Sequence, residues 1–254
     1  MQFETLDAQM RKFEETLDMT VPQDHYLVAR LDGRGFTKLT KETCDFEAPF
    51  DVRFRDAMVE TAKHLLSCGF RAVYAYVQSD EISILFHPAN EAFGGKVRKY
   101  NSVLAGEASA KCSLLLGTPA VFDCRLIALP FTADVVDYFA WRMQDATRNA
   151  LNAHCYWGLR KQGSTVSVAT AAVEGKSIAE KTAMLASLGV EFDALPAWQK
   201  RGMGILRGKV EKEGFDPVRG VKVVTQRTAL VTEYDLPERE PYAKKIRALL
   251  HEEA

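Results

Sequence analysis

Apolar residues in the first part of the chain recur at spacings of three and four, which is the period of one face of a helix. They are Phe3, Leu6, Met10, Phe13 and Leu17. Charged residues occupy most positions between them. We therefore expect an amphipathic helix whose apolar stripe docks on the rest of the domain, with a contact between copies of the chain as the alternative.

A strand pattern follows, because apolar residues occupy every second position of residues 25–32, up to Gly33. Residues 51–68 return to helical spacing, and Gly69 is a plausible stop for that helix. A second helix is predicted over about 96–116.

Two short β-rich runs separate these helices and predict a hairpin, and a further run predicts a last strand that ends at Pro130. These runs are RAVYAYV, ISILF and AVFDCRLIAL. The order is therefore β-α-β-β-α-β, an α+β plan known as ferredoxin-like. We expect a four-stranded antiparallel sheet with the first and third strands adjacent at its centre, and with the helices on one face.

The second half of the chain has a different character. A long helix is predicted over about 133–161, and residues 164–230 combine two helical stretches with two β-like runs, GILRG and VKVVTQRTALV. Residues 239–254 predict a terminal helix. We interpret residues 1–137 as the catalytic domain and residues 138–254 as the long helix with a smaller lobe.

Candidate chemistry lies where the predicted first and third strands meet. Asp32 closes the first strand, and Asp80 and Glu81 precede the third, so the topology places these carboxylates at one edge of the sheet. Like charges held close together are unfavourable unless a cation neutralises them. Oxygen ligands without a nearby His or Cys indicate Mg²⁺, and a pair of such ions is typical of nucleotidyl transfer.

Glycines and basic residues accompany this acidic group. Gly33 and Gly35 would let the backbone approach a phosphate, although a simple turn is the better explanation of the two glycines taken alone. Lys96, Arg98 and Lys99 begin the second helix, where basic residues oppose the helix dipole. We expect them to contact triphosphate oxygens; a solvated first turn is the alternative.

The long helix carries cations, amides and aromatic residues that could contact RNA, although a helix with one packed and one solvated face would look the same. They are Trp141, Arg142, Arg148, Asn149, Asn152, His154, Arg160 and Lys161.

Composition narrows the class of protein. The 33 Lys and Arg nearly balance the 34 Asp and Glu, which excludes a globally basic nucleic-acid coat but permits a local basic patch. The five scattered cysteines indicate reduced thiols and a cytoplasmic protein. We expect no membrane partner, since no run approaches about 18 apolar residues.

Several segments together resemble the tRNA-His guanylyltransferase superfamily, in order over roughly residues 3–230. They are RLDGRGF, APFDVRF, YVQSDEISILF, FDCRLIALP and YFAWRMQDATRNAL. The resemblance implies a fold like the palm of polymerases and an enzyme that adds nucleotides to the 5′ end of tRNA in the 3′-to-5′ direction. It implies two Mg²⁺ ions, ATP or GTP as substrates, tRNA as partner and a homotetramer.

The resemblance also assigns residues. The metal ligands correspond to Asp32, Asp80 and the carbonyl of Gly33, and Glu81 corresponds to the acidic residue beside the second aspartate. Lys96 and Lys99 correspond to triphosphate-binding cations. The nucleotide-binding residues correspond to Asp32, Gly33, Arg34, Gly35, Phe36, Thr37, Ser79 and Asp80.

Two departures distinguish this chain from the eukaryotic branch of the superfamily. A KPND stretch is here Ala48 to Asp51, and the histidine of a HINNLYN motif is here Thr147. These departures favour the bacterial and archaeal branch, which repairs 5′-truncated tRNA on a template, while guanylate addition to tRNA-His stays open. The alternatives are a palm-type nucleotide cyclase or dinucleotide synthase, and a non-catalytic tRNA-binding protein.

Overall fold

A six-stranded antiparallel sheet forms the centre of the computed structural model, which describes residues 2–216 and 221–251. The strand order is β4-β1-β3-β2-β5-β6, so the first and third strands are neighbours as predicted, but the sheet has six strands and the expected number of four is wrong. The strands are β1 (Tyr26–Gly33), β2 (Ala72–Gln78), β3 (Glu81–Phe86), β4 (Phe122–Leu129), β5 (Met203–Asp216) and β6 (Val221–Glu233).

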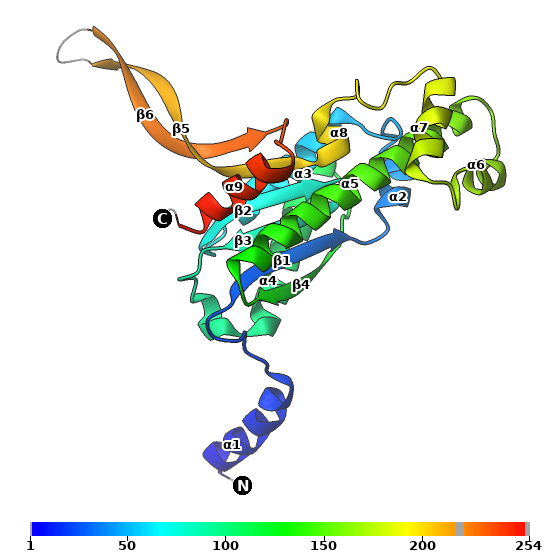
Figure 1. Cartoon of the computed structure of the whole chain (residues 1–254). Helices are drawn as coiled ribbons and strands as arrows, with labels where there is room; N and C mark the ends of the chain where they lie inside the picture. Colours follow the sequence, from blue (N-terminus) through cyan, green and yellow to red (C-terminus); the bar gives the residue numbers. More distant parts are fainter. Residues whose placement is uncertain (1, 217–220, 252–254) are drawn as a thin grey trace.

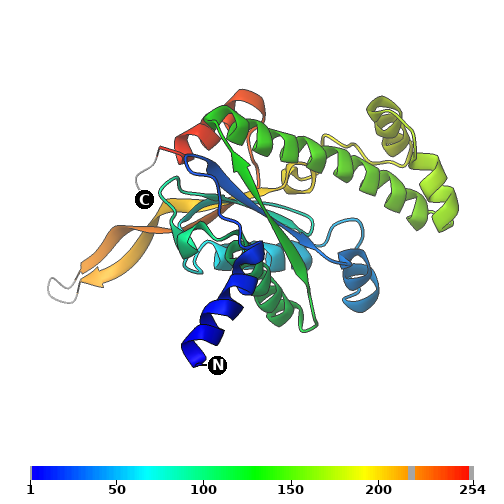
Figure 2. The same ribbon diagram turned by 90° about the horizontal axis from the view of Figure 1, so that it is seen from below.

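Helices cover both faces of this sheet (Figures 1 and 2). The two helices of the predicted β-α-β-β-α-β order, α3 (Val52–Leu65) and α4 (Val97–Leu116), lie on one face as expected. The long helix α5 (Thr132–Lys161) and the terminal helix α9 (Arg239–Leu249) cover the other. Of the predicted terminal helix over 239–254, residues 252–254 lie outside the described residues.

The period of two in β1 explains why both faces are packed. Leu27, Ala29 and Leu31 point into the core beneath α3 and α4, whereas Val28 points into the core beneath α5. Towards the end of the strand, the second face becomes polar at Arg30 and Asp32. The fold is therefore α+β, with one polar stretch at a defined end of the sheet.

Short helices complete the described residues. They are α1 (Phe3–Glu14), α2 (Phe36–Lys38), α6 (Val166–Val173), α7 (Ile178–Ser187) and α8 (Ala197–Arg201), with 3-10 turns at Glu15–Leu17 and Ala92–Gly95 and a π-helical turn η2 at Leu39–Thr43.

We expected the two β-like runs of the second half to belong to a separate smaller lobe, but they do not. β5 pairs with β2 through Tyr74↔Leu206 to Val77↔Met203, so it extends the central sheet. Gly204 permits this approach, because a Cβ there would lie 2.8 Å from the hydroxyl of Tyr74. Only α6 and α7 form a satellite, which packs on the far end of α5 around Leu151 and Leu185 (Figure 1).

The prediction that α1 docks on the domain is wrong. None of its residues from Phe3 to Glu14 is buried, and the helix projects away from the sheet (Figures 1 and 2). Phe3 is 76% exposed, Phe13 67% and Leu17 85%. The apolar stripe predicted from the spacing is present, but it has no partner within the described part of the chain.

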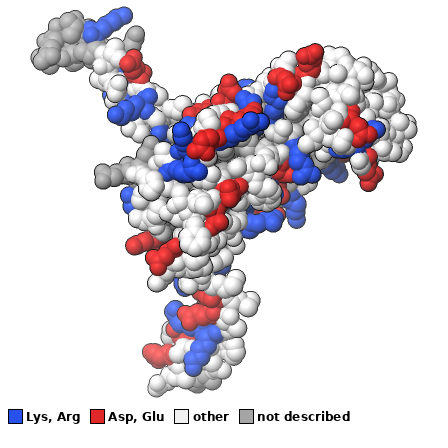
Figure 3. All heavy atoms as spheres, in the orientation of Figure 1, with Lys and Arg blue, Asp and Glu red and all other residues white. Residues whose placement is uncertain are grey.

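Three further expectations concern the molecule as a whole. The five cysteines, all in the described residues, are free thiols. Within residues 2–216 and 221–251 no helix is both long and apolar enough to cross a membrane. Basic and acidic side chains are intermixed on the face shown in Figure 3, and the surface over α6 and α7 is largely uncharged there.

Candidate active site

Asp32 and Asp80 lie at the ends of neighbouring strands and line the same cleft. Asp32 lies near the end of β1, and Asp80 lies in the turn between β2 and β3. The backbone N–H of Gly33 donates to the carbonyl of Asp80 at 3.1 Å, which ties that turn to the end of β1. The structure therefore brings together the two carboxylates that the strand order predicted to meet.

Asp80 is strongly perturbed by this position. Burial is the main cause, and the nearby carboxylate of Asp32 adds to it, so that the pKa of Asp80 rises to about 6 although the Ser79 hydroxyl opposes the shift. A divalent cation between the carboxylates would offset both causes. The donor set, two carboxylates with the carbonyl of Gly33 in the same turn, fits Mg²⁺, which commonly binds one or two carboxylates and completes its shell with water and phosphate.

Glu81 does not join this pair as a free carboxylate. It accepts a bidentate ion pair from Arg142 of α5 at 2.7 and 2.8 Å, and a further one from Arg30 of β1 at 2.7 Å. Burial raises the pKa of Glu81, and the two guanidinium groups oppose that rise. Among the described residues, no group of three or more His, Cys, Asp or Glu side chains is arranged to hold a metal. We therefore interpret Glu81 as a positioning residue.

Arg142 is correspondingly not available to RNA. Its side chain is 3% exposed, and it also pairs with Asp145 at 3.0 Å. Of the RNA-contact candidates on the long helix, Arg142 thus belongs to the packed face, whereas Arg148 and Asn149 are exposed.

The segment after Asp32 forms a tight turn that leads into α2. A Cβ at Gly33 would lie 2.4 Å from the ring of Phe36, and Gly35 adopts a φ of 73°, so both positions require glycine. Phe36 is buried against Phe122, with ring centroids 4.9 Å apart. Of the predicted nucleotide loop, Asp32, Phe36 and Thr37 line the cleft, together with Ser79 from the hairpin.

The cleft has a volume of about 410 Å³, and two chemically different groups of side chains line it. Gln78, Ser79, Asp80 and Asp32 lie where β1 and β2 end, and we call them the acidic end. Four aromatic side chains come from the loop before α3, from α5 and from α8, and we call them the aromatic wall. They are Phe46, Phe50, Trp157 and Trp198.

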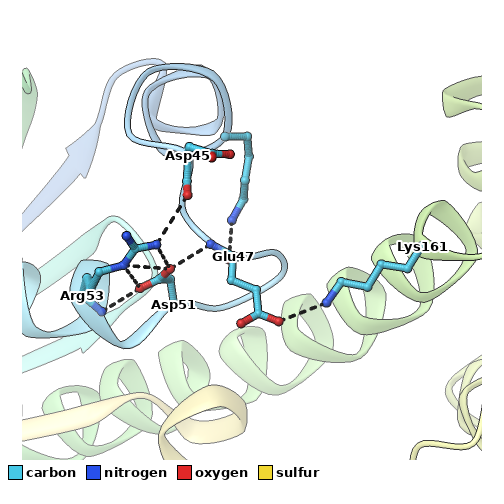
Figure 4. Close-up of polar contacts among 6 residues, drawn as sticks. Asp45, Glu47, Asp51, Arg53 and Lys161 are labelled. Atoms are coloured by element: carbon cyan, nitrogen blue, oxygen red, sulfur yellow. Dashed lines mark hydrogen bonds and ion pairs between the residues drawn. The ribbon is translucent and has the colours of Figure 1, made fainter.

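The loop before α3 is held by Asp51 (Figure 4). Its carboxylate accepts from the backbone N–H groups of Glu47 and Arg53 at 2.8 and 2.7 Å, and it pairs with the Arg53 guanidinium at 2.6 Å. Arg53 holds the pKa of Asp51 well below its ordinary value. The side chain of Glu47 pairs with Lys161 at 3.3 Å and so joins the loop to α5.

Lys41 is a cation in the aromatic part of the cleft that the sequence patterns did not single out. Its Nζ donates to the carbonyl of Glu47 at 3.0 Å and lies 5.8 Å from the ring centroid of Trp157. Burial lowers the pKa of Lys41. No local spacing relates it to Trp157, so only the fold reveals this contact.

Lys96 and Lys99 lie elsewhere and are not among the residues that line the described cleft. Lys96 pairs with Asp18 at 3.1 Å, and Arg98 also contacts that carboxylate. The hydroxyl of Ser109 in α4 accepts from the N–H of Phe122, which is the register partner of Gly33 in the sheet. The acidic end therefore lies near the later turns of α4. At 1.5 Å per residue, Lys96 is about 20 Å further along the helix axis. Its role in triphosphate binding stays a prediction.

Comparisons with known proteins agree with this geometry. Residues 7–130 match the family described as tRNAHis guanylyltransferase, and residues 133–246 match its C terminal domain. A probable tRNA(His) guanylyltransferase of Drosophila melanogaster is 30% identical over 211 residues, which cover 79% of this chain and 73% of that protein.

Solved structures show the same relationship. A bacterial tRNA(His) guanylyltransferase-like protein in complex with GTP has a TM-score of 0.73 and 25% identity, with 97% of this chain and 99% of that chain covered. The tRNA(His) guanylyltransferase of Saccharomyces cerevisiae has the same fold, with a TM-score of 0.70 and 23% identity, but the match covers 78% of this chain and 91% of that one.

Proposed function

Because the chain belongs to the tRNA-His guanylyltransferase family of tRNA nucleotidyltransferases, we propose that it adds nucleotides to the 5′ end of tRNA in the 3′-to-5′ direction, with Mg²⁺. Its main reaction would be templated repair of 5′-truncated tRNA, and guanylate addition to tRNA-His would be a second product of the same site. The observation that carries this proposal is the pair Asp32 and Asp80 in one cleft, which the aromatic wall also lines.

The reaction requires two successive displacements at phosphorus. In the first, the 5′-monophosphate of tRNA attacks the α-phosphate of ATP or GTP and releases pyrophosphate. In the second, the 3′-hydroxyl of the incoming nucleoside triphosphate attacks the activated 5′-phosphate and releases the activating nucleotide. A tRNA that already carries a 5′-triphosphate would enter at the second step and release pyrophosphate.

Residues of the acidic end have distinct roles in this proposal. Asp32, Asp80 and the Gly33 carbonyl would hold Mg²⁺, which when bound neutralises phosphate charge and favours the attacking oxyanion. Glu81, fixed between Arg30 and Arg142, orients the turn that carries Asp80. The aromatic wall offers rings on which a nucleobase can stack.

Two observations support the repair reaction over addition restricted to tRNA-His. The bacterial guanylyltransferase-like protein aligns over nearly its whole length, whereas the yeast enzyme leaves about a fifth of this chain unmatched. Thr147 stands where the eukaryotic branch has a histidine, and its hydroxyl lies 3.0 Å from the carbonyl oxygens of both Met143 and Lys200, between which its one proton is shared. Its hydroxyl is thereby committed to holding α8 against α5.

The proposal is tested with labelled nucleotides and a panel of tRNAs that lack their first nucleotide, each prepared with a 5′-monophosphate and a 5′-triphosphate. We expect the incorporated base to change when the opposing nucleotide of the acceptor stem is changed, and D32N to incorporate nothing. Incorporation of guanylate whatever the opposing base would contradict templated repair. A cyclic or dinucleotide product formed without RNA, or tRNA binding without pyrophosphate release, would establish one of the alternative functions.

A further inference from the structure

Gln78 lies in the same row of the sheet as Asp32. Glu81 is the register partner of Asp32 on one side and of Gln78 on the other. The residues two and four positions before Gln78, Tyr76 and Tyr74, pack beneath α5, so Gln78 also faces the cleft side of the sheet. With strands about 4.8 Å apart, Gln78 lies roughly 10 Å across the sheet from Asp32.

The side chain of Gln78 is buried but incompletely bonded. The residue is 8% exposed, it lines the cleft, and its Oε1 has no hydrogen-bond partner among the described residues. The register of β2 and β5 ends at Val77↔Met203, and the residue just before β5 is Gly202, which also lines the cleft and has no side chain that could bond Gln78. A buried acceptor without a donor destabilises a fold, so its presence in a cleft indicates a ligand contact.

In the orientation that the structure gives the Gln78 amide, the unpaired atom is an acceptor, and this restricts what can bind it. Phosphate oxygens also accept, so a triphosphate cannot satisfy Oε1. The triphosphate is expected at Asp32, two strands away, and at Asp80, in the turn that follows Gln78. The part of a nucleotide that adjoins the triphosphate and carries donors is the ribose.

We propose that Gln78 accepts a hydrogen bond from a ribose hydroxyl of the nucleotide bound in the cleft and so sets the position of its sugar. This inference rests on the proposed function only in taking a nucleoside triphosphate as the ligand. It makes Gln78 a binding residue that recognises ribonucleotides over the deoxy form.

Equilibrium binding of GTP, 2′-deoxy-GTP and 3′-deoxy-GTP with Mg²⁺, measured by calorimetry, tests this on the wild type and on Q78M. In the wild type, loss of one of the two hydroxyls should weaken binding about 3- to 10-fold, as for one neutral hydrogen bond. In Q78M the same loss should change binding by less than twofold. Methionine is similar in length and lacks the acceptor, so we expect Q78M to melt no lower than the wild type.

Gln199 provides a matched control, because it lines the same cleft but its Oε1 already lies 3.1 Å from Nε2 of His154. Q199M should keep the wild-type difference between GTP and its deoxy forms. Equal binding of all three nucleotides by the wild type would overturn the proposal without any variant. An equal loss of affinity for the deoxy forms in Q78M and wild type would also overturn it. So would a loss of affinity on replacing GTP by ITP, which lacks the guanine amine, that occurs in the wild type and disappears in Q78M, because Gln78 would then bind the base.

These measurements contain no tRNA. A wild type that discriminates between the sugars but never extends tRNA would therefore refute the proposed function and keep the inference about Gln78. A wild type that extends tRNA but binds GTP and its deoxy forms equally would keep the proposed function and refute the inference about Gln78.

Discussion

At Asp80, burial and the neighbouring carboxylate of Asp32 both oppose ionisation and raise the pKa to about 6. Asp80 would therefore be easier to accommodate as a neutral residue. The chain nevertheless places the two acids together at the end of two strands. Such an arrangement is typical of a site that binds a cation, because the ion supplies the positive charge that neutralises the two carboxylates.

Substitution of either aspartate by asparagine should abolish nucleotide addition while keeping the fold. Asparagine preserves the shape but removes the charge that binds Mg²⁺, so we expect incorporation by D32N and D80N to fall at least about 100-fold, equivalent to roughly 2.7 kcal/mol or more in the barrier. Incorporation into truncated tRNA is the measurement, and circular dichroism is the control for folding. Wild-type rates in either variant would refute the assignment.

D80N should also change stability in a pH-dependent way without metal. Because the folded pKa of Asp80 lies above its ordinary value of 3.8, the wild type loses stability as pH rises from about 4 to 6. D80N cannot ionise, so it should be more stable by about 1–3 kcal/mol above pH 6 and equal near pH 4. Denaturant unfolding in EDTA measures this, and a D80N less stable than wild type at pH 7 would contradict it.

The buried pair of Arg142 and Glu81 should dominate stability at the same end of the sheet. R142M leaves Glu81 with Arg30 alone, and we expect it to destabilise the protein by about 3–5 kcal/mol. Arg148 is exposed on the same helix, so R148M should change the free energy of unfolding by less than about 0.5 kcal/mol. Similar unfolding midpoints for the two variants would show that the pair is not structural.

The sequence predicted Asp32 and Asp80 because their meeting requires only the strand order and the strand ends. It could not predict the partners of Glu81, since Arg142 lies 61 residues away on a helix that packs across the sheet. Lys41 and Gln78 were missed for the same reason. Their surroundings come from tertiary packing and leave no periodic signal.

At the scale of elements, the loop before α3 depends on one side chain. Asp51 caps α3, binds the backbone of Glu47 and pairs with Arg53, so three contacts converge on its carboxylate. This loop carries Phe46 and Phe50 of the aromatic wall. Loss of the Asp51 contacts should therefore disturb both the lining of the cleft and the start of α3.

D51N tests this dependence through pH. Because Arg53 holds the pKa of Asp51 below its ordinary value of 3.8, the charged form stabilises the fold above about pH 4, and this contribution is lost as pH falls further. Asparagine can still cap the helix, so D51N should be less stable by about 1–2 kcal/mol at pH 7. This difference should begin to shrink below about pH 4 and persist in part at pH 3, because the lowered pKa keeps Asp51 charged in the folded protein there. D56N, at an exposed neighbour, is the control.

Most helices and strands lie where the sequence predicted them, but β5 extends to Asp216, well beyond the predicted run GILRG. The pairing partners of β5 and β6 were not predicted, because a β-like run does not say which strand edge it will pair with. The edge of β2 receives β5 because Gly202 and Gly204 allow close approach to Tyr76 and Tyr74. Sequence spacing alone gave no reason to connect residues so far apart.

At the scale of the whole molecule, α1 offers an exposed apolar stripe on a helix that leaves the body of the protein. The predicted homotetramer would explain this stripe as a contact between copies. Light scattering should then give a mass near four times the 28.4 kDa of one chain. Removal of residues 2–17 should lower that mass.

The same deletion should leave each subunit folded, because none of the residues of α1 is buried and Asp18 keeps its contacts to Lys96 and Arg98. We expect the melting temperature of a diluted sample to change by less than about 2 °C. A large loss of helicity beyond α1 itself would show that the helix supports the core. An unchanged mass would remove α1 as the contact between copies.

The pairing of β2 with β5 has a consequence for biosynthesis. The ribosome releases β2 early, but its neighbour emerges only after α4, β4 and all of α5 have been made. During that interval a nascent chain presents an open row of N–H and C=O groups, to which another unfinished chain can bind. Delayed closure of the sheet, rather than the finished enzyme, is thus the stage at which this protein most needs protection from aggregation.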